Sequence, residues 1–344
     1  MADTVKVGVI GAGRIGRVHA SNLAHLIPGA KLIAIADVIE EAAQKLAADL
    51  GVANAYNDPR KIFDDKQIDA VIVCSSTDTH AQMMEAAAEA KKHIFCEKPI
   101  ALDLPRIDRA LAAVEKAGVK LQIGFNRRFD PSFKHVRDVV ASGKIGVPHI
   151  LRITSRDPAP PPLAYVKVSG GIFLDMTIHD FDMARYQVGS EAEEIFAAGN
   201  VLVDSEIGKA GDIDTAVITL RFKNGALGVI DNSRQAVFGY DQRVEVLCSN
   251  GMAAADNKYP DTFMQSDATS VSRTLPLNFF MERYTESFVA EMNAFIRSVL
   301  ENKTPPVTGM DGRIPVVMGY AALKSYKENR PVKLSEIDKK GEKT

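Results

Sequence analysis

The stretch Gly11-Ala12-Gly13-Arg14-Ile15-Gly16 decides the fold of the first part of this chain. An apolar run at 5–10 precedes it, and a helix-forming segment at 14–26 follows it. In such a strand–turn–helix context the first glycine permits the tight turn, the second lets the backbone approach a pyrophosphate, and the third lets the helix pack closely on the strand. The phosphates then lie at the positive end of the helix. The spacing therefore predicts a dinucleotide-binding Rossmann domain.

Outward from this loop, strands and helices alternate up to about residue 125. Further strands are expected at 31–36, 69–74, 93–96 and 121–125, and helices at 40–50, 79–90 and 105–117. This rhythm predicts a parallel sheet with right-handed crossovers.

The pattern changes around Asn126, where a helix is expected at 131–142 and strand candidates then follow with few long helices between them. These candidates are 150–154, 216–222, 226–230 and 244–247, with an Asn-Gly hairpin turn at Asn224-Gly225. Long helices are expected at 284–301 and within 311–327. We therefore predict an α/β Rossmann domain at 1–125, an α+β domain with a large open, mainly antiparallel sheet at 126–334, and a charged tail with a frayed end at 335–344.

Composition excludes several classes of protein. Of 344 residues, 46% are hydrophobic and 25% charged, and the formal net charge is −2, so no electrostatic footprint for nucleic acid or an anionic membrane is expected. No apolar run approaches the roughly 20 residues that span a bilayer, and the start of the chain has no signal core, which favours a cytoplasmic protein. Cys74, Cys96 and Cys248 lack metal-ligand spacing and are expected to be buried free thiols.

Asp37 indicates which dinucleotide binds. It follows the second expected strand at about the ~20-residue spacing at which a carboxylate accepts hydrogen bonds from the adenosine ribose. A carboxylate there repels a 2′-phosphate, and no Arg or Lys follows in Val38-Ile39-Glu40. We therefore expect NAD rather than NADP; the alternative is an ordinary surface turn.

Glu97-Lys98-Pro99 follows the fourth strand, and ligands of open parallel sheets bind beyond the carboxyl ends of the strands. Alone, this motif would indicate only an exposed lysine beside a turn proline. Together with the glycine loop, Ser75-Ser76-Thr77-Asp78-Thr79-His80, and Gly170-Gly171-Ile172-Phe173-Leu174-Asp175 through His179, it makes nearly the whole chain resemble the glucose–fructose oxidoreductase/inositol dehydrogenase (Gfo/Idh/MocA) family. The segments 124–130, 155–158 and 175–185 resemble bacterial inositol 2-dehydrogenases in particular.

The resemblance implies NAD dependence and a homotetramer built through the open sheet of the second domain. One departure is Ser76, where many relatives have proline, which implies a small difference in the nicotinamide contacts. The expected cofactor-binding residues are Gly11, Gly13, Arg14, Ile15, Gly16, Asp37, Ser75, Ser76, Thr77, His80, Glu97 and Lys98.

Oxidation of a secondary alcohol needs a base, a group that stabilises the alkoxide, and a carbon close to the nicotinamide. Asp175 and His179 are four residues apart and share a face if the segment is helical. We assign His179 as the general base, Asp175 as the group that orients the substrate hydroxyl or the imidazole, and Lys98 as the cation beside the alkoxide. The resemblance supports these assignments. Without it, an Asp and a His on an amphipathic helix are more often a cap and a half-buried side chain.

A polyol offers hydroxyls rather than apolar surface, so its pocket should hold several polar side chains. The expected substrate-binding residues are Lys98, Arg127, Asp157, Asp175, His179 and Tyr240, with Asn232 and His80 as weaker candidates. For Arg127, Asp157 and Tyr240 the alternative is a domain-interface salt bridge or a core tyrosine. Asp180 and Asp182 point around the helix rather than converging with His179, so no metal is expected.

These residues lead to the hypothesis of an NAD-dependent inositol 2-dehydrogenase that oxidises myo-inositol to 2-keto-myo-inositol (scyllo-inosose). The first alternative is an NAD(P)-dependent dehydrogenase of another polyol or sugar, such as scyllo- or chiro-inositol or glucose. The second is an NAD-binding regulator without catalysis, which the fold also hosts. The joint presence of Lys98, Asp175 and His179 argues against the regulator.

Overall fold

The computed structural model describes residues 4–338. By their internal contacts these residues form two compact units. The first contains the chain up to Phe129 together with Glu286–Ile314, and the second contains Asp130–Thr285 together with the chain from Pro315 on. The segment Glu286–Ile314, which a division of the sequence at residue 125 leaves in the second domain, contacts the first unit.

The first unit is built on a fully parallel six-stranded sheet in the order β3-β2-β1-β4-β5-β6. Its strands are β1 (Val5–Ile10), β2 (Ala30–Ala36), β3 (Asn54–Tyr56), β4 (Ala70–Val73), β5 (His93–Glu97) and β6 (Leu121–Gly124). The four residues of β4 are all buried, as are the four of β6, because helices cover both faces of a parallel sheet. The predicted alternation of strands and helices is confirmed, and the short β3 and the helix after it are additions that no periodicity indicated.

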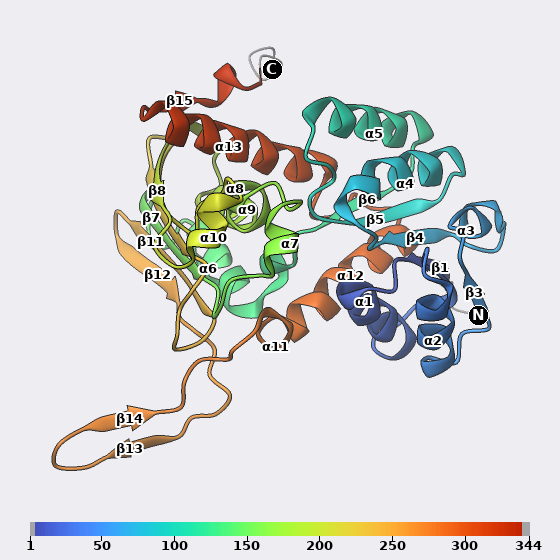
Figure 1. Cartoon of the computed structure of the whole chain (residues 1–344), viewed down its shortest axis with the longest axis horizontal. Coiled ribbons are helices and arrows are strands. Elements are labelled where there is room, and N and C mark those ends of the chain that lie inside the picture. Colours follow the sequence, from blue (N-terminus) through green and yellow to red (C-terminus); the bar gives the residue numbers. More distant parts are fainter. Residues whose placement is uncertain (1–3, 339–344) are drawn as a thin grey trace. The chain divides into compact units, whose positions relative to one another are not determined.

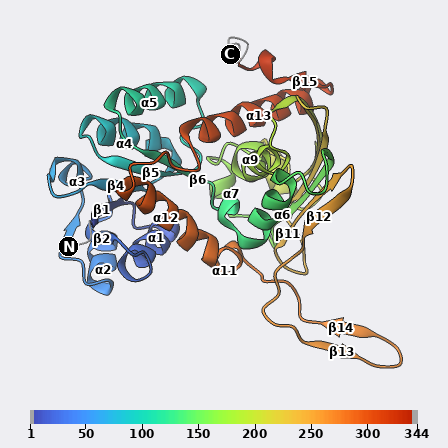
Figure 2. The ribbon, with the colours of Figure 1, turned by 180° about the vertical axis from the view of Figure 1, so that it is seen from behind.

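Helices pack on both faces of this sheet. They are α1 (Arg14–His25), α2 (Glu40–Asp49), α3 (Arg60–Asp64), α4 (Thr77–Glu89), α5 (Leu104–Ala117) and α12 (Thr285–Leu300), with a 3-10 turn η1 at Asn126–Phe129. Figures 1 and 2 show α4 and α5 on one face and α1, α2 and α12 on the other. The core under α12 contains Met292, Phe295 and Ile296 packed with residues of β1 and α1. A helix from late in the chain therefore completes the Rossmann core.

The second unit is built on a seven-stranded mixed sheet in the order β12-β11-β7-β10-β9-β8-β15. Its strands are β7 (Pro148–Arg156), β8 (Ala192–Asn200), β9 (Thr215–Phe222), β10 (Leu227–Ser233), β11 (Asp241–Cys248), β12 (Gly251–Ala255) and β15 (Val332–Lys333). Only the β7–β10 pair among them is parallel, and the predicted Asn224-Gly225 turn joins the antiparallel β9 and β10. The expected α/β Rossmann fold followed by an α+β domain with a mainly antiparallel sheet is thus confirmed.

Helices cover one face of this second sheet. They are α6 (Pro131–Ala141), α7 (Leu163–Val166), α8 (Ile172–Asp175), α9 (Thr177–Val188), α10 (Ser205–Lys209), α11 (Phe280–Arg283) and α13 (Gly309–Glu328), and the 3-10 turn η2 spans Leu334–Glu336. Figures 1 and 2 show α6, α8 and α9 on the same side of the sheet. The strand β9 alternates buried and exposed residues along its length, because only one of its faces is covered.

Two features lie outside these layers. The strands β13 (Met264–Ser266) and β14 (Val271–Arg273) form a separate hairpin, and residues 261–273 are exposed throughout (Figure 1). All three cysteines are buried with free thiols, as predicted. The last six residues of the expected charged tail, 339–344, lie outside the described residues. Across residues 4–338 there is no helix with the length and hydropathy needed to cross a membrane.

Candidate active site

The glycine loop joins β1 to α1, and each glycine there has a different environment. A Cβ at Gly11, whose φ is +103°, would lie 2.4 Å from the carbonyl oxygen of Cys74. A Cβ at Gly16 would lie 1.9 Å from the carbonyl oxygen of Gly11. Gly13 is exposed, and a Cβ built there would meet no atom within 4 Å. Gly11 and Gly16 are therefore required by the fold, whereas the open space over Gly13 fits the approach of a pyrophosphate.

Asp37, half-buried directly after β2, holds the glycine loop. Its Oδ2 accepts a 2.6 Å hydrogen bond from the backbone N–H of Ala12, and its Oδ1 accepts one of 2.8 Å from the N–H of Ile39. The spacing argument placed Asp37 near the ribose but did not reveal these contacts with the backbone. The carboxylate therefore fixes the loop in addition to presenting negative charge at the end of β2.

The loop after β4 carries the expected Ser75, Ser76 and Thr77. Ser76 is exposed and precedes the first residue of α4, Thr77. The hydroxyl of Ser75 lies 2.7 Å from that of Thr79, which donates to the carbonyl of Ser76. His80 is only 2% exposed, and its ring nitrogens lie 2.9 Å from the carbonyl oxygens of Pro99 and Ser75. Its contacts therefore join two loops at the carboxyl ends of β4 and β5.

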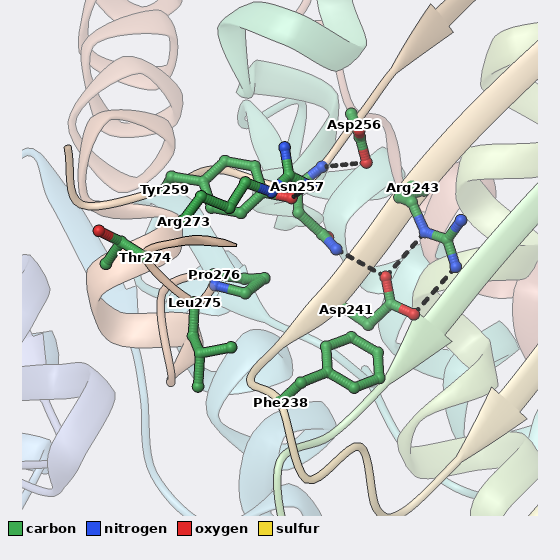
Figure 3. Close-up of a pocket in the computed structure, with 10 residues that line it drawn as sticks. All are labelled: Phe238, Asp241, Arg243, Asp256, Asn257, Tyr259, Arg273, Thr274, Leu275 and Pro276. Atoms are coloured by element: carbon green, nitrogen blue, oxygen red, sulfur yellow. Dashed lines mark hydrogen bonds and ion pairs between the residues drawn. The ribbon is translucent and has the colours of Figure 1, made fainter. Parts of the chain in front are cut away.

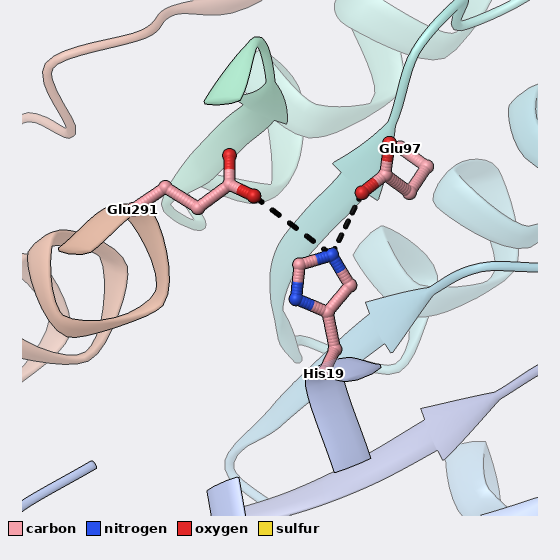
Figure 4. A group of neighbouring side chains, drawn as sticks. All are labelled: His19, Glu97 and Glu291. Carbon is pink, nitrogen blue, oxygen red and sulfur yellow. Dashed lines mark hydrogen bonds and ion pairs between the residues drawn. The ribbon is translucent and has the colours of Figure 1, made fainter. Parts of the chain in front are cut away.

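Lys98 follows β5 and is half-buried, and the Lys98–Pro99 peptide bond is cis. Its neighbour Glu97 lies 2.7 Å from Nε2 of the fully buried His19, which is on α1 (Figure 4). Glu291 of α12 lies on the other side of this ring, with its Oε1 3.9 Å from the same nitrogen. Within the described part of the chain, these three residues are the group whose ligand atoms lie close enough for a metal ion. The expectation of no metal did not consider His19 or Glu291.

In the second unit, Asp175 is the last residue of α8, and one exposed and one buried side chain hold its carboxylate. The hydroxyl of Tyr165 donates to Oδ1 over 2.8 Å, and Nη1 of Arg234 donates to Oδ2 over 3.2 Å. Arg234 is 1% exposed and also reaches Asp212, 3.5 Å away. Asp212 in turn accepts from the backbone N–H of Ile172 at the start of α8. Residues from three separate segments, Tyr165, Arg234 and Asp212, therefore form the network that orients Asp175.

Tyr165 keeps its proton in this network. Burial raises the pKa of its phenol above the ordinary value, and the negative charge of Asp175 raises it further. A protonated phenol donates to the carboxylate rather than competing with it. Since the side chain is about half exposed, its hydroxyl also borders solvent.

His179 lies in α9, half-buried, and the helix is interrupted between it and Asp175. Met176 separates α8 from α9, and the backbone N–H of His179 donates to the carbonyl of Met176 over 3.3 Å. The two residues are thus carried by two short helices rather than by one continuous helical face. Asp180 accepts a hydrogen bond from Asn232, and Asp182 lies 3.9 Å from Arg185, so both carboxylates are engaged within the fold.

Asn232 of β10 is 1% exposed and binds protein groups with both ends of its amide. Its nitrogen donates to Asp180 and to the carbonyl of Ser155, and its oxygen accepts from the hydroxyl of Thr177. These contacts use the hydrogen-bonding capacity that a substrate would need. Its place in the structure is a link between β10, β7 and α9.

The remaining substrate candidates belong to different environments. Arg127, in η1 of the first unit, is 5% exposed, and Tyr240 of the second unit is 6% exposed with its ring edge-on to Tyr284. Asp157 is half-buried, and its backbone N–H donates to the carbonyl of Ser233 over 2.9 Å. Lys98 and Arg127 lie in the first unit, and Asp157, Asp175, His179 and Tyr240 lie in the second.

A pocket of about 340 Å³ lies at the base of the β13–β14 hairpin, and none of the candidate residues lines it (Figure 3). Its lining residues are Phe238, Asp241, Arg243, Asp256, Asn257, Tyr259, Arg273, Thr274, Leu275 and Pro276. Asp241 accepts from Arg243 and Asn257, and these bonds lower its pKa although burial opposes them. The polar groups of this pocket satisfy one another, so we assign it no part in the site.

Sequence reasoning missed His19, Arg234, Asp212 and the role of Tyr165. Each is a common residue type with no distinctive neighbours in sequence, and its partner lies far away along the chain. His19 is 78 residues from Glu97, and Arg234 is 59 residues from Asp175. A single sequence carries no signal for such pairs.

Comparisons with known proteins agree with this architecture. Residues 5–125 match the model of the GFO/IDH/MocA oxidoreductase family, described as an NAD-binding Rossmann fold, and residues 133–254 match the GFO/IDH/MocA C-terminal domain. The chain is 56% identical over 333 residues to the myo-inositol 2-dehydrogenase of Thermotoga maritima, covering 97% of this chain and 99% of that protein. It is 43% identical over 332 residues to the inositol 2-dehydrogenase of Rhizobium meliloti, covering 96% of this chain and 100% of that protein.

A solved structure extends the comparison to bound ligands. The scyllo-inositol dehydrogenase of Lactobacillus casei, crystallised with NAD(H) and scyllo-inositol, superposes with a TM-score of 0.90 at 31% identity. The match covers 97% of this chain and all of that one.

Proposed function

This chain belongs to the GFO/IDH/MocA oxidoreductase family, and we propose that it is an NAD-dependent inositol 2-dehydrogenase that oxidises myo-inositol to 2-keto-myo-inositol. The observation that carries the proposal is its similarity to the myo-inositol 2-dehydrogenase of Thermotoga maritima over nearly the full length of both chains. The open cradle over Gly13 and the fixed carboxylate of Asp175 support the same activity.

The residues for NAD come from the first unit. Gly11, Gly13 and Gly16 shape the pyrophosphate cradle with the adjoining Arg14 and Ile15, and Asp37 presents its carboxylate to the adenosine ribose. Ser75, Ser76 and Lys98 lie in the loops at the carboxyl ends of β4 and β5, where open parallel sheets bind ligands. Two further residues proposed for NAD adjoin these loops, since Thr77 begins α4 and Glu97 ends β5. When bound, NAD accepts a hydride from the substrate carbon.

The chain's own residues manage the proton and the developing charge. His179 takes the proton of the reacting hydroxyl as general base. The ammonium of Lys98 stabilises the oxygen as its negative charge grows, and it therefore lowers the barrier for loss of the proton. The hydroxyl proton thus goes to His179 and the hydride to NAD, and the secondary alcohol becomes a ketone.

Asp175 orients these groups. Tyr165 donates to one of its oxygens and Arg234 donates to the other, so both oxygens are held in place beside the substrate hydroxyl or the imidazole that we propose it orients. A carboxylate held by two donors loses little freedom on binding, so it is pre-organised for one arrangement of hydroxyls. Arg127, Asp157 and Tyr240 are the further substrate residues we propose; the ring of Tyr240 is held by its edge-on contact with Tyr284.

Assays on purified protein test the proposal directly. NADH formation should be measured with myo-inositol, scyllo-inositol, a chiro-inositol, glucose and xylose, each with NAD and with NADP. We expect the highest kcat/KM with myo-inositol and NAD. A higher value with scyllo-inositol, the ligand in the Lactobacillus casei structure, would move the assignment to that stereoisomer. No turnover on any substrate, with NADH still bound, would favour a non-catalytic regulator.

The open face of the second sheet supports the further proposal of a homotetramer. Ile150, Leu227, Leu247 and Met252 lie side by side on four strands, since Ile150 is opposite both Leu227 and Leu247, and Leu247 is opposite Met252. Each is 41–54% exposed. Such an apolar row on a broad sheet face favours burial against a second copy. Sedimentation of the wild type and of Leu247→Glu tests it: a monomeric wild type would exclude the assembly.

A further inference from the structure

Both chain neighbours of Lys98 are held by buried histidines. Glu97 precedes it and contacts His19 of α1, and Pro99 follows it and contacts His80 of α4. His19 is 0% exposed and His80 is 2% exposed. Neither histidine belongs to the acid–base set proposed above, so their burial beside this loop needs its own explanation.

The contact between His19 and Glu97 is surrounded by packed side chains and backbone. Nε2 of His19 lies 2.7 Å from Oε1 of Glu97, and the imidazole packs edge-on against Phe95 and Phe288. The carboxylate of Glu97 also fills the space beside Gly124, where a Cβ would lie 3.0 Å from the carboxyl carbon. Because α1 begins at the glycine loop, this hydrogen bond ties the backbone before Lys98 to the helix that carries the pyrophosphate cradle.

The second contact fixes the backbone after Lys98. One ring nitrogen of His80 lies 2.9 Å from the carbonyl oxygen of Pro99, and the other lies 2.9 Å from that of Ser75. Each ring nitrogen that carries a proton donates to the carbonyl that it faces. The imidazole therefore spans the loops after β4 and β5 and leaves no space for either to move toward the other.

Glu291 decides the charge of the first contact. It is fully buried, and both of its oxygens lack a hydrogen-bond partner within the described chain. Burial raises the pKa of its carboxyl well above the ordinary value, and the negative charge of Glu97 adds to the effect. The raised pKa favours the neutral form of Glu291, which does not compete with Glu97 for the hydrogen bond from His19.

A metal ion would be the other way to compensate two buried carboxylates, and the geometry speaks against it. A ligating histidine almost always donates its second ring nitrogen to a partner, and Nδ1 of His19 has none among the described residues. Moreover, the 2.7 Å contact between His19 and Glu97 is a hydrogen-bond distance. The distances therefore fit a hydrogen bond between His19 and Glu97 better than ligation of a metal ion.

We propose that His19, acting through Glu97, and His80, acting through Pro99, are positioning residues that hold Lys98 at its place in the catalytic site. The proposal rests on the dehydrogenase function proposed above. Neither histidine touches the reacting atoms. His19 fixes the residue before Lys98 and His80 fixes the residue after it. The backbone of Lys98, and with it the ammonium group, is therefore held in one position at the carboxyl end of β5.

Paired substitutions test this arrangement. His19→Leu and His80→Leu remove the donor, whereas His19→Gln and His80→Gln keep an amide N–H at similar reach. We expect each leucine variant to lower kcat by about tenfold or more, with the NAD Kd within about threefold of the wild type, and each glutamine variant to recover part of the loss. The deuterium isotope effect on kcat with C2-deuterated inositol should rise, since a displaced lysine slows the chemical step. A fall in active fraction with an unchanged isotope effect would mean a merely structural role.

A double-mutant cycle asks whether the histidines act through Lys98. In the Lys98→Ala background, His19→Leu and His80→Leu should lower the residual rate by no more than about twofold. Equal losses in both backgrounds would overturn the proposal.

Glu291→Gln is the matched control in the same cluster, because a neutral amide replaces a group that we hold to be neutral, and its kcat should match the wild type. A loss as large as that of His19→Leu would contradict the charge assignment, and a stoichiometric metal ion in the purified protein would replace the hydrogen bond with a metal site.

One readout does not depend on turnover. Reductive methylation with ¹³C-formaldehyde labels the lysines, and the NMR signal absent from Lys98→Arg reports on Lys98. This signal should change in position and in its pH titration in His19→Leu and His80→Leu, but not in Glu291→Gln. Failure of the proposed function would appear as a wild type without turnover, whereas failure of this inference would appear as an unchanged Lys98 signal. The two failures are therefore distinguishable.

Discussion

The phenol hydroxyl of Tyr165 donates a 2.8 Å hydrogen bond to Oδ1 of Asp175, and the buried guanidinium of Arg234 holds the other oxygen of the same carboxylate. The carboxylate of Asp175 thus accepts hydrogen bonds from one exposed donor, Tyr165, and one buried donor, Arg234. The buried donor fixes the position of the carboxylate, and the exposed one stands at the border with solvent. On the strength of this hydrogen bond we propose that Tyr165, which no motif singled out, is part of the site.

Tyr165→Phe should therefore weaken inositol turnover without changing NAD binding. A hydrogen bond to a charged group is worth about 1.5–3 kcal/mol, which corresponds to a loss of roughly tenfold or more in kcat/KM for inositol. Steady-state kinetics measure it, with Tyr326→Phe as control, because the Tyr326 ring packs near Phe173, which lies on the same helix α8 as Asp175. Equal values for wild type and Tyr165→Phe would separate Asp175 from substrate binding.

Lys98→Ala and His179→Ala should each reduce inositol oxidation to a small residual rate and leave NAD binding nearly intact. In the proposed mechanism Lys98 supplies the cation beside the developing alkoxide and His179 takes the proton, so each would act on the chemical step rather than on the cofactor. Single-turnover rates and NADH fluorescence titration separate the two effects. The exposed Lys45 of α2, changed to Ala, serves as the charge control. A variant that keeps close to full kcat would remove that residue from the catalytic set.

The three glycines of the cradle should respond differently to alanine. Gly11→Ala and Gly16→Ala place a Cβ against backbone carbonyls, so both should lower the Tm of the protein without cofactor. Gly13→Ala meets no protein atom and should leave that Tm unchanged, but its methyl group takes the space that a pyrophosphate needs, so the NADH Kd should rise. Calorimetry and fluorescence titration measure the two quantities. Normal NADH binding by Gly13→Ala would mean that the pyrophosphate lies elsewhere.

Asp37→Asn should reduce the preference for NAD over NADP. The amide keeps the shape of the side chain and one of its two acceptor oxygens, so it keeps one of the hydrogen bonds from the backbone N–H groups of Ala12 and Ile39, and it removes the charge that repels a 2′-phosphate. We expect the ratio of kcat/KM for NAD to that for NADP to fall by about tenfold, the effect of roughly 1.4 kcal/mol. The isosteric change is better than Asp37→Ala, which would also loosen the glycine loop. An unchanged ratio would exclude Asp37 as the selector.

Glu291 makes the stability of the fold depend on pH. Its carboxyl has a raised pKa in the folded state, so the folded chain binds a proton that the unfolded chain releases. This contribution is fully present below the ordinary pKa of 4.5 and is lost as pH rises through the folded-state pKa. Each unit of raised pKa costs about 1.4 kcal/mol at high pH.

Glu291→Gln removes this cost. Its Tm should exceed that of the wild type at alkaline pH, and the difference should shrink toward pH ~4.5, the ordinary pKa of a glutamate side chain. Calorimetry across the range measures both curves. Parallel curves at every pH would show that Glu291 titrates as an ordinary carboxyl.

Much of this protein followed from its sequence because the relevant groups are neighbours along the chain. The Gly11–Gly16 loop, the apolar strands and the Asn224-Gly225 turn are set by backbone sterics and short-range periodicity, so the Rossmann fold, a mainly antiparallel second sheet and the hairpin at this turn were predicted. The parallel pairing of β7 with β10 was not predicted. The placement of Lys98 after β5 was predictable for the same reason.

Only the tertiary structure decided what holds those residues. His19 meets Glu97 and Glu291 across three elements, and α12 completes a core whose first strand begins at residue 5. Met176 interrupts the helix between Asp175 and His179, and Arg234 reaches Asp175 from a distant strand end. Burial, which sets the protonation of Glu291 and the donors to Asp175, is a property of packing. It arises only when segments distant in sequence exclude water together, and no local pattern records it.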